Sequence, residues 1–329
     1  MNFDYNEEQQ LLADSVRRFL QKDYDFEKRK AILQNGWSER VWATFAEMGL
    51  TALPLPAEHG GFGGGAVDLM SVMEAFGEAL VVEPYLPTVL AAQVIAKAGS
   101  PQQKQSILPL VAQGKMRLAL ATGERGVIGA PMADKVVFLR GNEIWVIGRS
   151  ELPLKPHRTL DDLAAAEIRF DGKGEKPGHA DSALLEEVQD FGAALSCAEA
   201  VGAMKFACDT TLEYLKARRQ FGVPIGAFQA LQHRMVDMFI SYEQAKSMAC
   251  LACSKVDQSE SANERSRAVS AAKIKIADSA RHISQESVQL HGGMGMSEEL
   301  KVSHTFRRLT VLARRFGDAD QHLARFASL

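Results

Sequence analysis

The sequence predicts a mainly α-helical protein that carries a small β domain between two helical regions. Apolar residues recur at helical spacing over both ends of the chain, whereas a short middle segment alternates apolar and polar residues. Of the 329 residues, 46% are hydrophobic and 24% are charged, which is the mixture expected of a folded globular protein. We therefore predict an N-terminal helical domain over residues 1–116, a β domain over residues 117–180 and a C-terminal four-helix bundle over residues 181–329.

Capping signals mark several helices of the N-terminal region. Asn6 begins the first helix as its N-cap, and Gln9, three residues later, completes a capping box. Ser38 begins a second helix, which ends at Gly49. Ser100 begins a third capped helix, with a proline in its first turn. Further helical patterns cover residues 66–80 and 88–98, and the helix that follows Ser100 continues to about residue 112.

The middle segment carries strand signals, and helical patterns return after it. Residues 135–140 and 143–147 flank Gly141 and Asn142, a two-residue hairpin signal. Residues 167–170 predict another strand. From residue 183 to residue 326, long helical patterns are interrupted by predicted loops at residues 222–226 and 258–263 and by a turn that contains Gly292, Gly293 and Gly295.

Charge and composition exclude several classes of function. The formal net charge of −3 provides no large basic surface, so we expect no nucleic-acid partner. The longest uncharged runs, residues 84–96 and 220–233, are shorter than the ~20 residues of a membrane-spanning helix, so we expect no membrane span. Residues 1–5 carry an acid and do not resemble a secretory signal. We therefore predict a cytoplasmic protein whose four cysteines are packed, free thiols.

Two separate motifs together resemble those of the acyl-CoA dehydrogenase family. Residues 214–229 read YLKARRQFGVPIGAFQ, in which a helix ends in arginines and is followed by Phe-Gly and a Pro-Gly loop. Residues 287–296 read SVQLHGGMGM, which is similar to the family's Gln-x-x-Gly-Gly-x-Gly turn. Taken alone, the first motif is also explained by basic residues at a helix C-terminus, and the second by a turn between helices. The pair, with further matches at residues 56–61 and 100–115, extends the resemblance over nearly the whole chain.

The resemblance implies a binding site for FAD that two subunits share. It implies that Arg218 and Gln220 hold diphosphate oxygens of FAD, since a guanidinium matches phosphate geometry. It also implies that side-chain-free positions in the turn let the dinucleotide approach the backbone. The remaining cofactor-binding residues implied in the same way are Phe221, Phe228, Gln229, Gln289, Gly292, Gly293 and Thr122. The flavin-covering hairpin of the family's β domain is missing after residue 125, so the β domain is a reduced one.

The family reaction needs a carboxylate base, and the usual positions lack one. Acyl-CoA dehydrogenases remove a proton from Cα of an acyl-CoA thioester while hydride leaves Cβ for the flavin. In relatives the base is a glutamate at one of two positions, which correspond here to Phe316 and Gly192. Asp318 is our first candidate for the base, because Gly317 interrupts the helical pattern beside it. Glu199 lies in an apolar helix, where a structural carboxylate is the favoured interpretation.

The resemblance is closest to the short, small-subunit branch of bacterial heteromeric acyl-CoA dehydrogenases. It implies an acyl-CoA substrate, with a steroid side-chain or dicarboxylic acyl group, and an electron-transferring flavoprotein as electron acceptor. It also implies a homodimer or a heterotetramer with a longer homologue. Three hypotheses remain open: a flavin-dependent dehydrogenase, a non-catalytic small subunit that completes the FAD site of a longer partner, and a helical protein that binds no nucleotide.

Overall fold

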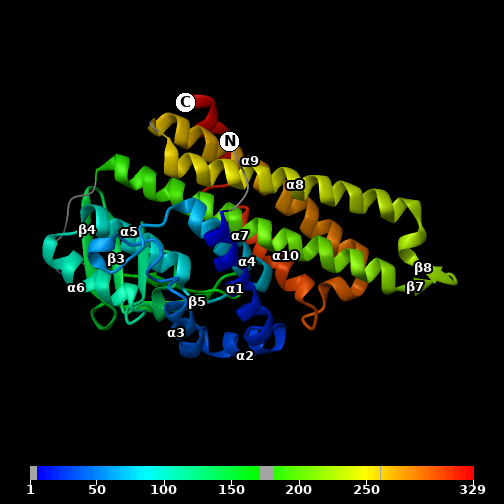
Figure 1. The fold of residues 1–329 in the computed structure, drawn as a ribbon, viewed down its shortest axis with the longest axis horizontal. Helices are drawn as coiled ribbons and strands as arrows, with labels where there is room; N and C mark the ends of the chain where they lie inside the picture. The colour runs from blue at the N-terminus through cyan, green and yellow to red at the C-terminus, as the bar shows by residue number, and fades with distance from the viewer. Residues whose placement is uncertain (1–5, 171–180, 260) are drawn as a thin grey trace. The chain divides into compact units, whose positions relative to one another are not determined.

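The computed structural model describes residues 6–170, 181–259 and 261–329, and it is mostly helical with a small β region (Figure 1). This confirms the predicted fold class. By the density of their contacts, the described residues form two compact units. Unit 1 contains residues 6–26, 70–81 and 193–329, and unit 2 contains residues 27–69 and 82–192 except for the undescribed segment. The predicted boundaries at residues 116 and 180 stay predictions, and residue 180 lies outside the described residues.

Unit 2 contains two small sheets and the helices around them. The strands of the first sheet have the order β1-β3-β4, and those of the second have the order β2-β6-β5. Helices α5 and α6 pack against each other, and α5 contacts β1 and β3. The helices that lie wholly or mainly in this unit are α2 (Phe26–Asn35), α3 (Glu39–Glu47), α5 (Tyr85–Ala98) and α6 (Pro101–Ala112), and the strands are β1 (Leu118–Ala121), β2 (Val127–Ile128), β3 (Lys135–Arg140), β4 (Glu143–Gly148), β5 (Leu154–Arg158) and β6 (Ala164–Ile168).

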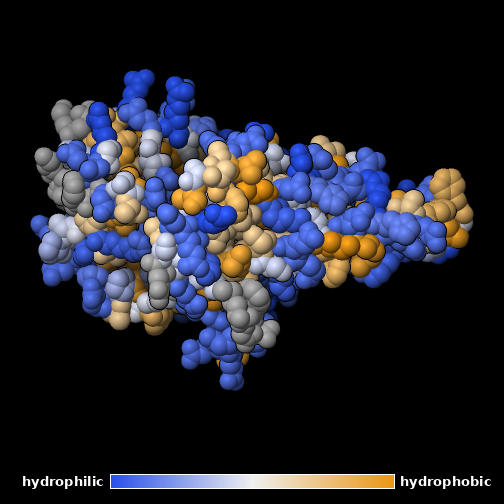
Figure 2. All heavy atoms as spheres, turned by 90° about the horizontal axis from the view of Figure 1, so that it is seen from above, coloured by the Kyte–Doolittle hydropathy of each residue, from blue (hydrophilic) through white to orange (hydrophobic). Residues whose placement is uncertain are grey.

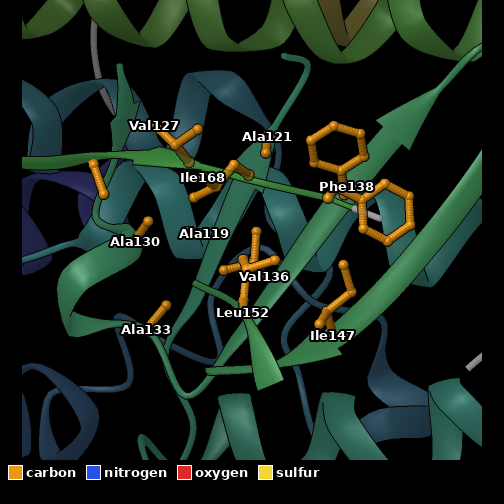
Figure 3. Close-up of a cluster of buried hydrophobic side chains, with 12 residues drawn as sticks. Ala119, Ala121, Val127, Ala130, Ala133, Val136, Phe138, Ile147, Leu152 and Ile168 are labelled. Atoms are coloured by element: carbon orange, nitrogen blue, oxygen red, sulfur yellow. The ribbon is translucent and has the colours of Figure 1, made fainter. Parts of the chain in front are cut away.

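A buried apolar cluster joins the strands of unit 2 (Figure 3). Phe138 and Ile147 enter it from the predicted hairpin of β3 and β4, and Ile168 enters it from β6. Trp145 of β4 packs against the cluster. The predicted strand at residues 167–170 is wrong in its bounds, because β6 begins three residues earlier, where small alanines pair with β2 and β5.

Unit 1 contains the long helices of the C-terminal half of the chain. Helix α9 packs along α8, α10 and α11, and the N-terminal helix α1 belongs to the same unit. Buried Val16 and Leu20 on α1 contribute to its core. The helices of this unit are α1 (Glu7–Asp23), most of α4 (Ala66–Ala79), the larger part of α7 (Ser182–Ala217), α8 (Gln229–Gln258), α9 (Ala262–His291), α10 (Lys301–Leu312) and α11 (Ala319–Ser328), and strands β7 (Arg219–Gln220) and β8 (Val223–Pro224) form a hairpin between α7 and α8.

Helices α4 and α7 cross at two glycines within unit 1. A Cβ atom added at Gly77 would lie 1.8 Å from the carbonyl oxygen of Glu199, and one added at Gly202 would lie 1.8 Å from that of Glu74. Any larger side chain at either position would therefore force the two backbones apart.

Helix α7 is the only helix in the described parts of the chain that is long and apolar enough to cross a membrane. Of its apolar window, 89% is buried inside the structure. Its composition is therefore explained by its position in the core, where apolar residues on every side of a helix are expected.

Candidate cofactor site

The first predicted motif folds into a tight hairpin at the end of α7 (Figure 1). Gln220 pairs with Val223 across the hairpin, and Phe221 and Gly222 at its tip have φ angles of 55° and 81°. Positive φ at both central residues is the geometry that a two-residue hairpin with the twist of β-strands requires. Phenylalanine adopts it at a cost, since its Cβ crowds the backbone there. The aromatic ring is 89% exposed, so the tip presents it to the surroundings.

Arg218 and Gln220 lie at the base of this hairpin, and both are exposed. The Arg218 carbonyl accepts a hydrogen bond from the Ile225 amide at 2.8 Å, which fixes the backbone. The Arg218 guanidinium has no hydrogen-bond or ion-pair partner among the described residues. The Gln220 side chain donates to the adjacent Arg219 carbonyl at 2.9 Å, and within the described part of the chain it has no other hydrogen-bond partner. The hairpin therefore holds one uncommitted cation and one amide in a fixed position.

The second predicted motif forms the turn after α9. Helix α9 ends at His291, and Gly292 has a φ of 62° and donates its amide to the Gln289 carbonyl. A Cβ atom added at Gly292 or Gly293 would meet nothing within 4 Å. Both glycines and the Gln289 side chain are exposed. An open, side-chain-free turn of this kind lets a ligand approach the backbone closely.

A stacked pair of rings joins the two motifs. Tyr214, in the last turn of α7, lies parallel to His291 with ring centroids 4.4 Å apart, and its hydroxyl donates to the His291 carbonyl at 3.4 Å. One turn earlier, the hydroxyls of Thr211 and Ser287 lie 2.8 Å apart. Burial lowers the pKa of His291, whose Nδ1 lies 2.8 Å from the Ser287 carbonyl. The stack of Tyr214 on His291 has no signal in the sequence, because the two residues lie on different helices and far apart in the chain. The contact of His291 with Ser287 does have one, since residues four apart on a helix are neighbours.

The aromatic residues and glutamine after the tip lie where α8 begins. Phe228 precedes α8, and its ring meets that of Phe221 edge to face, with centroids 6.2 Å apart. Gln229 is the first residue of α8 and is exposed. Thr122, in contrast, belongs to unit 2, where it follows β1 and is exposed. The structure thus brings the hairpin and glycine-turn residues together in unit 1 and describes Thr122 separately.

Asp318, the candidate base, begins α11 as its N-cap. Its carboxylate accepts from the Gln321 amide at 2.9 Å, and the Gln321 side chain accepts from the Asp318 amide at 3.0 Å. The preceding Phe316 and Gly317 have φ angles of 61° and 108°, so the helical register is indeed broken before Asp318. Asp318 is exposed, and its carboxylate has a structural role as the N-cap of α11.

The other carboxylate considered, Glu199, is a buried partner of two arginines. Its Oε1 lies 2.5 Å from Nη1 of Arg308, and its Oε2 lies 3.6 Å from Nη1 of Arg315. The favoured interpretation of Glu199 as a structural carboxylate agrees with this ion pair. Within the described ranges, no group of three or more histidine, cysteine, aspartate or glutamate residues could hold a metal ion.

The hairpin and glycine turn fit the diphosphate portion of a dinucleotide such as FAD. Arg218 supplies an uncommitted guanidinium, the turn supplies open backbone, and Phe221 and Phe228 supply aromatic surface for a base. Guanidinium groups bind phosphate oxygens bidentately, and aromatic rings stack on planar bases. These residues would hold the cofactor at one end of unit 1.

Comparison with known proteins gives matches over the whole chain. The acyl-CoA dehydrogenase N-terminal domain matches residues 6–115, and the acyl-CoA dehydrogenase C-terminal domain matches residues 184–327. Acyl-CoA dehydrogenase IpdE2 of Mycobacterium tuberculosis is 31% identical over 98% of this chain and 97% of its own.

Solved structures share the fold at lower identity. The ChsE4–ChsE5 complex from Mycobacterium tuberculosis has a TM-score of 0.90 at 21% identity and covers 100% of this chain and 98% of its own. A variant of the Tcur3481–Tcur3483 steroid ACAD has a TM-score of 0.87 at 23% identity, with coverages of 98% and 97%. The FAD complex of PigA has a TM-score of 0.88 at 23% identity, with coverages of 100% and 98%. The two domain matches and the full-length relative show that the chain belongs to the acyl-CoA dehydrogenase family.

Proposed function

We propose that this chain is a subunit of an FAD-dependent acyl-CoA dehydrogenase that desaturates an acyl-CoA thioester between Cα and Cβ. The observation that carries the proposal is the contact between Tyr214 and His291, which brings the Arg218 hairpin and the open glycine turn to one end of unit 1. Family membership and the FAD complex of a protein with this fold support the choice of dinucleotide.

In this proposal, the chain's own residues bind and orient the cofactor. Arg218 neutralises the diphosphate, Gln220 donates to one of its oxygens, and Phe221 and Phe228 flank the adenosine. Gln289, Gly292 and Gly293 close around the same diphosphate from the second motif. Thr122 is proposed to contact the flavin from the β domain. FAD, when bound, supplies the acceptor for the hydride that leaves Cβ.

Removal of the Cα proton requires a carboxylate, and here the observations favour the second candidate function. Phe316 and Gly192 occupy the two usual positions of the base, and Asp318 already caps α11. We therefore also propose that this chain is the non-catalytic small subunit that completes the FAD site of a longer homologue. The heteromeric ChsE4–ChsE5 complex, whose fold is similar, supports this assembly.

The substrate proposed is an acyl-CoA with a steroid side-chain or dicarboxylic acyl group, and the electron acceptor is an electron-transferring flavoprotein. The fold shared with the Tcur3481–Tcur3483 steroid ACAD supports the steroid class. We propose a cytoplasmic location, which is supported by four free cysteines, as is usual in a reducing compartment.

Absorbance of the purified chain tests the function and separates its two forms. A yellow protein whose flavin bleaches anaerobically on addition of an acyl-CoA supports the catalytic form. A chain that bleaches only when mixed with a longer homologue from the same organism supports the small-subunit form. A chain that takes up no flavin, alone or in such a mixture, contradicts both.

A further inference from the structure

A lysine lies in the core of unit 1 among apolar residues of its own helix. Hydrophilic residues predominate on the face of the molecule that Figure 2 shows, and lysine is almost never fully buried unless its charge is paired. Lys273 is nevertheless 1% exposed, and it shares the buried face of α9 with Val269, Ala272 and Ile276. Methionine would fill nearly the same space without removing a charge from water, which is costly. The presence of lysine therefore indicates a role for its ammonium group.

The ammonium group of Lys273 donates to two backbone carbonyls at the end of α10. Its Nζ lies 2.9 Å from the Leu312 carbonyl oxygen and 2.7 Å from the Arg315 carbonyl oxygen. The last carbonyls of a helix have no partner within it and form the negative end of its dipole, so a cation is favoured there. Burial lowers the pKa of Lys273, and the negative charge of Asp318 opposes this shift, so the two side chains interact electrostatically.

The two carbonyls belong to the connection between α10 and α11, residues 312–318, which we call the bend. Phe316 and Gly317 have φ angles of 61° and 108°, and a left-handed phenylalanine persists only where its surroundings hold it. His322 of α11 supplies one such contact, because its Nε2 lies 2.9 Å from the Phe316 carbonyl oxygen. Its Nδ1 lies 3.3 Å from Oγ of Ser270 on α9. Helix α9 therefore holds the bend in two places, once directly and once through α11.

A further contact reaches the bend from α7. Nη1 of Arg315 lies 3.6 Å from Oε2 of Glu199, while the carbonyl of the same arginine accepts from Lys273. Residue 315 is therefore held by both its side chain and its backbone. Strained segments that are held at several points are concentrated at functional sites. Since Lys273 contributes two hydrogen bonds to the backbone of the bend, we expect its loss to loosen this segment.

We propose that Lys273 is a positioning residue of the dehydrogenase site, which holds the bend, and with it the carboxylate of Asp318, in the geometry that removal of the Cα proton requires. This inference rests on the proposed function, because the bend contains both Phe316, at one of the usual positions of the base, and Asp318, the candidate base. In this role Lys273 acts through the backbone of the bend. A displacement of about 1 Å can slow an enzyme roughly 100-fold, so the geometry of the bend matters to the rate.

Hydrogen exchange of the full chain, followed by mass spectrometry, tests whether Lys273 holds the bend. Lys273→Met removes the donors at similar side-chain length, so the amides of residues 313–322 should exchange at least ~10-fold faster. Amides in the middle of α8 should exchange at the wild-type rate, which shows that the fold is intact. Lys275→Met is the matched control, because Lys275 lies on the same helix and its side chain has no hydrogen bond within the described residues. It should leave exchange in the bend unchanged.

A second substitution covers the case in which the methionine variant does not fold. Lys273→Gln keeps a hydrogen-bond donor on a shorter side chain, so the amides of the bend should exchange faster than in the wild type and more slowly than in a folded Lys273→Met variant. If the methionine variant is unfolded, the comparison of Lys273→Gln with Lys275→Met decides.

Bleaching of the flavin by acyl-CoA distinguishes positioning from a general loss of structure. It is measured on the preparation that bleaches, either the chain alone or its mixture with a longer homologue. Lys273→Met should lower the rate constant at saturating acyl-CoA at least ~10-fold and leave the dissociation constant of acyl-CoA within ~2-fold of the wild type. A merely structural role would reduce flavin content and weaken acyl-CoA binding together with the rate.

The outcomes separate this inference from the proposed function. Wild-type exchange of the bend in the folded Lys273 variants overturns the inference, and so does a wild-type bleaching rate in a variant whose bend exchanges faster. If no preparation takes up flavin, the proposed function is contradicted instead. The exchange experiment needs no flavin, so it still decides whether Lys273 positions the bend.

Discussion

At the scale of single residues, Arg218 carries the most direct test of the cofactor site. A charge-assisted hydrogen bond contributes roughly 1.5–3 kcal/mol, so Arg218→Ala should weaken FAD binding by about 10- to 100-fold. Flavin titration of the variant measures this. Lys216→Ala removes a nearby exposed cation that is paired with Glu213, and it should leave the affinity close to that of the wild type. Equal losses in both variants would indicate a general effect of charge.

Asp318 allows its two roles to be separated, because asparagine caps helices as well as aspartate does. Asp318→Asn should keep the thermal midpoint, whereas Asp318→Ala should lower stability by about 1 kcal/mol through loss of the cap. If Asp318 is the base, the asparagine variant also loses flavin bleaching by acyl-CoA. If the flavin of that variant bleaches at the wild-type rate, Asp318 is not the base, and removal of the Cα proton is assigned to a carboxylate elsewhere in the assembly.

His291 makes stability depend on pH in one direction. Burial holds its pKa below 6.5, so the folded state binds a proton less readily than the unfolded state. The contribution of neutral His291 to the stability of the folded state is therefore complete above about pH 6.5, and it is lost as the pH falls below that value. His291→Gln should therefore reduce the drop in unfolding free energy between about pH 7.5 and pH 5.5, measured by urea titration.

At the scale of elements, helix propensity and packing predict opposite effects of replacing a glycine where α4 and α7 cross. Alanine is a better helix former than glycine by about 1 kcal/mol, so propensity alone predicts that Gly202→Ala stabilises the protein. The structure predicts the opposite. The Cβ of an alanine at this position would lie 1.8 Å from the Glu74 carbonyl oxygen, so overpacking should lower the free energy of unfolding by about 1–3 kcal/mol. Thermal unfolding decides the sign. Gly123→Ala, where a Cβ meets nothing within 4 Å, is the control, and it should change stability little.

Local signals predicted those elements whose ends are set by local hydrogen bonds. The capping box at Asn6 and the N-caps at Ser38 and Ser100 are all present as predicted. Helix α2 was not predicted, because it has no recognisable cap and its hydrophobic residues form no clear stripe. Helix α5 begins at Tyr85, three residues before the predicted start, since its first turn is buried by neighbouring elements.

In the candidate site, too, features set by local sequence were predicted, and contacts between distant residues were not. The sequence predicted the glycine turn and a loop at residues 222–226, because glycines mark both, but the β7–β8 hairpin, which begins where a helix end was expected, was not predicted. The Tyr214–His291 stack and the Glu199–Arg308 ion pair were not predicted either, since each joins residues that are far apart in the chain. Such contacts follow from packing, which no local pattern encodes.

At the scale of the whole molecule, unit 1 is assembled from three separate stretches of the chain. Arg17 of α1 lies 3.7 Å from Glu74 of α4, and Arg308 of α10 donates to the Val81 carbonyl. A fragment of residues 182–329 therefore lacks part of the core around which its helices pack. We expect it to be helical by circular dichroism but to unfold with a broader and lower transition than the full chain. A sharp transition at the wild-type temperature would show that the C-terminal helices fold independently.

Phe221 also bears on any attempt to engineer this protein for heat resistance. Its left-handed backbone stores about 1–2 kcal/mol that glycine at the same position would release. Selection for thermal stability alone would therefore favour Phe221→Gly, which removes the aromatic ring. Under the proposed function, such variants would gain stability and lose the aromatic contact with the adenosine of FAD, so selection has to be coupled to ligand retention from the first round.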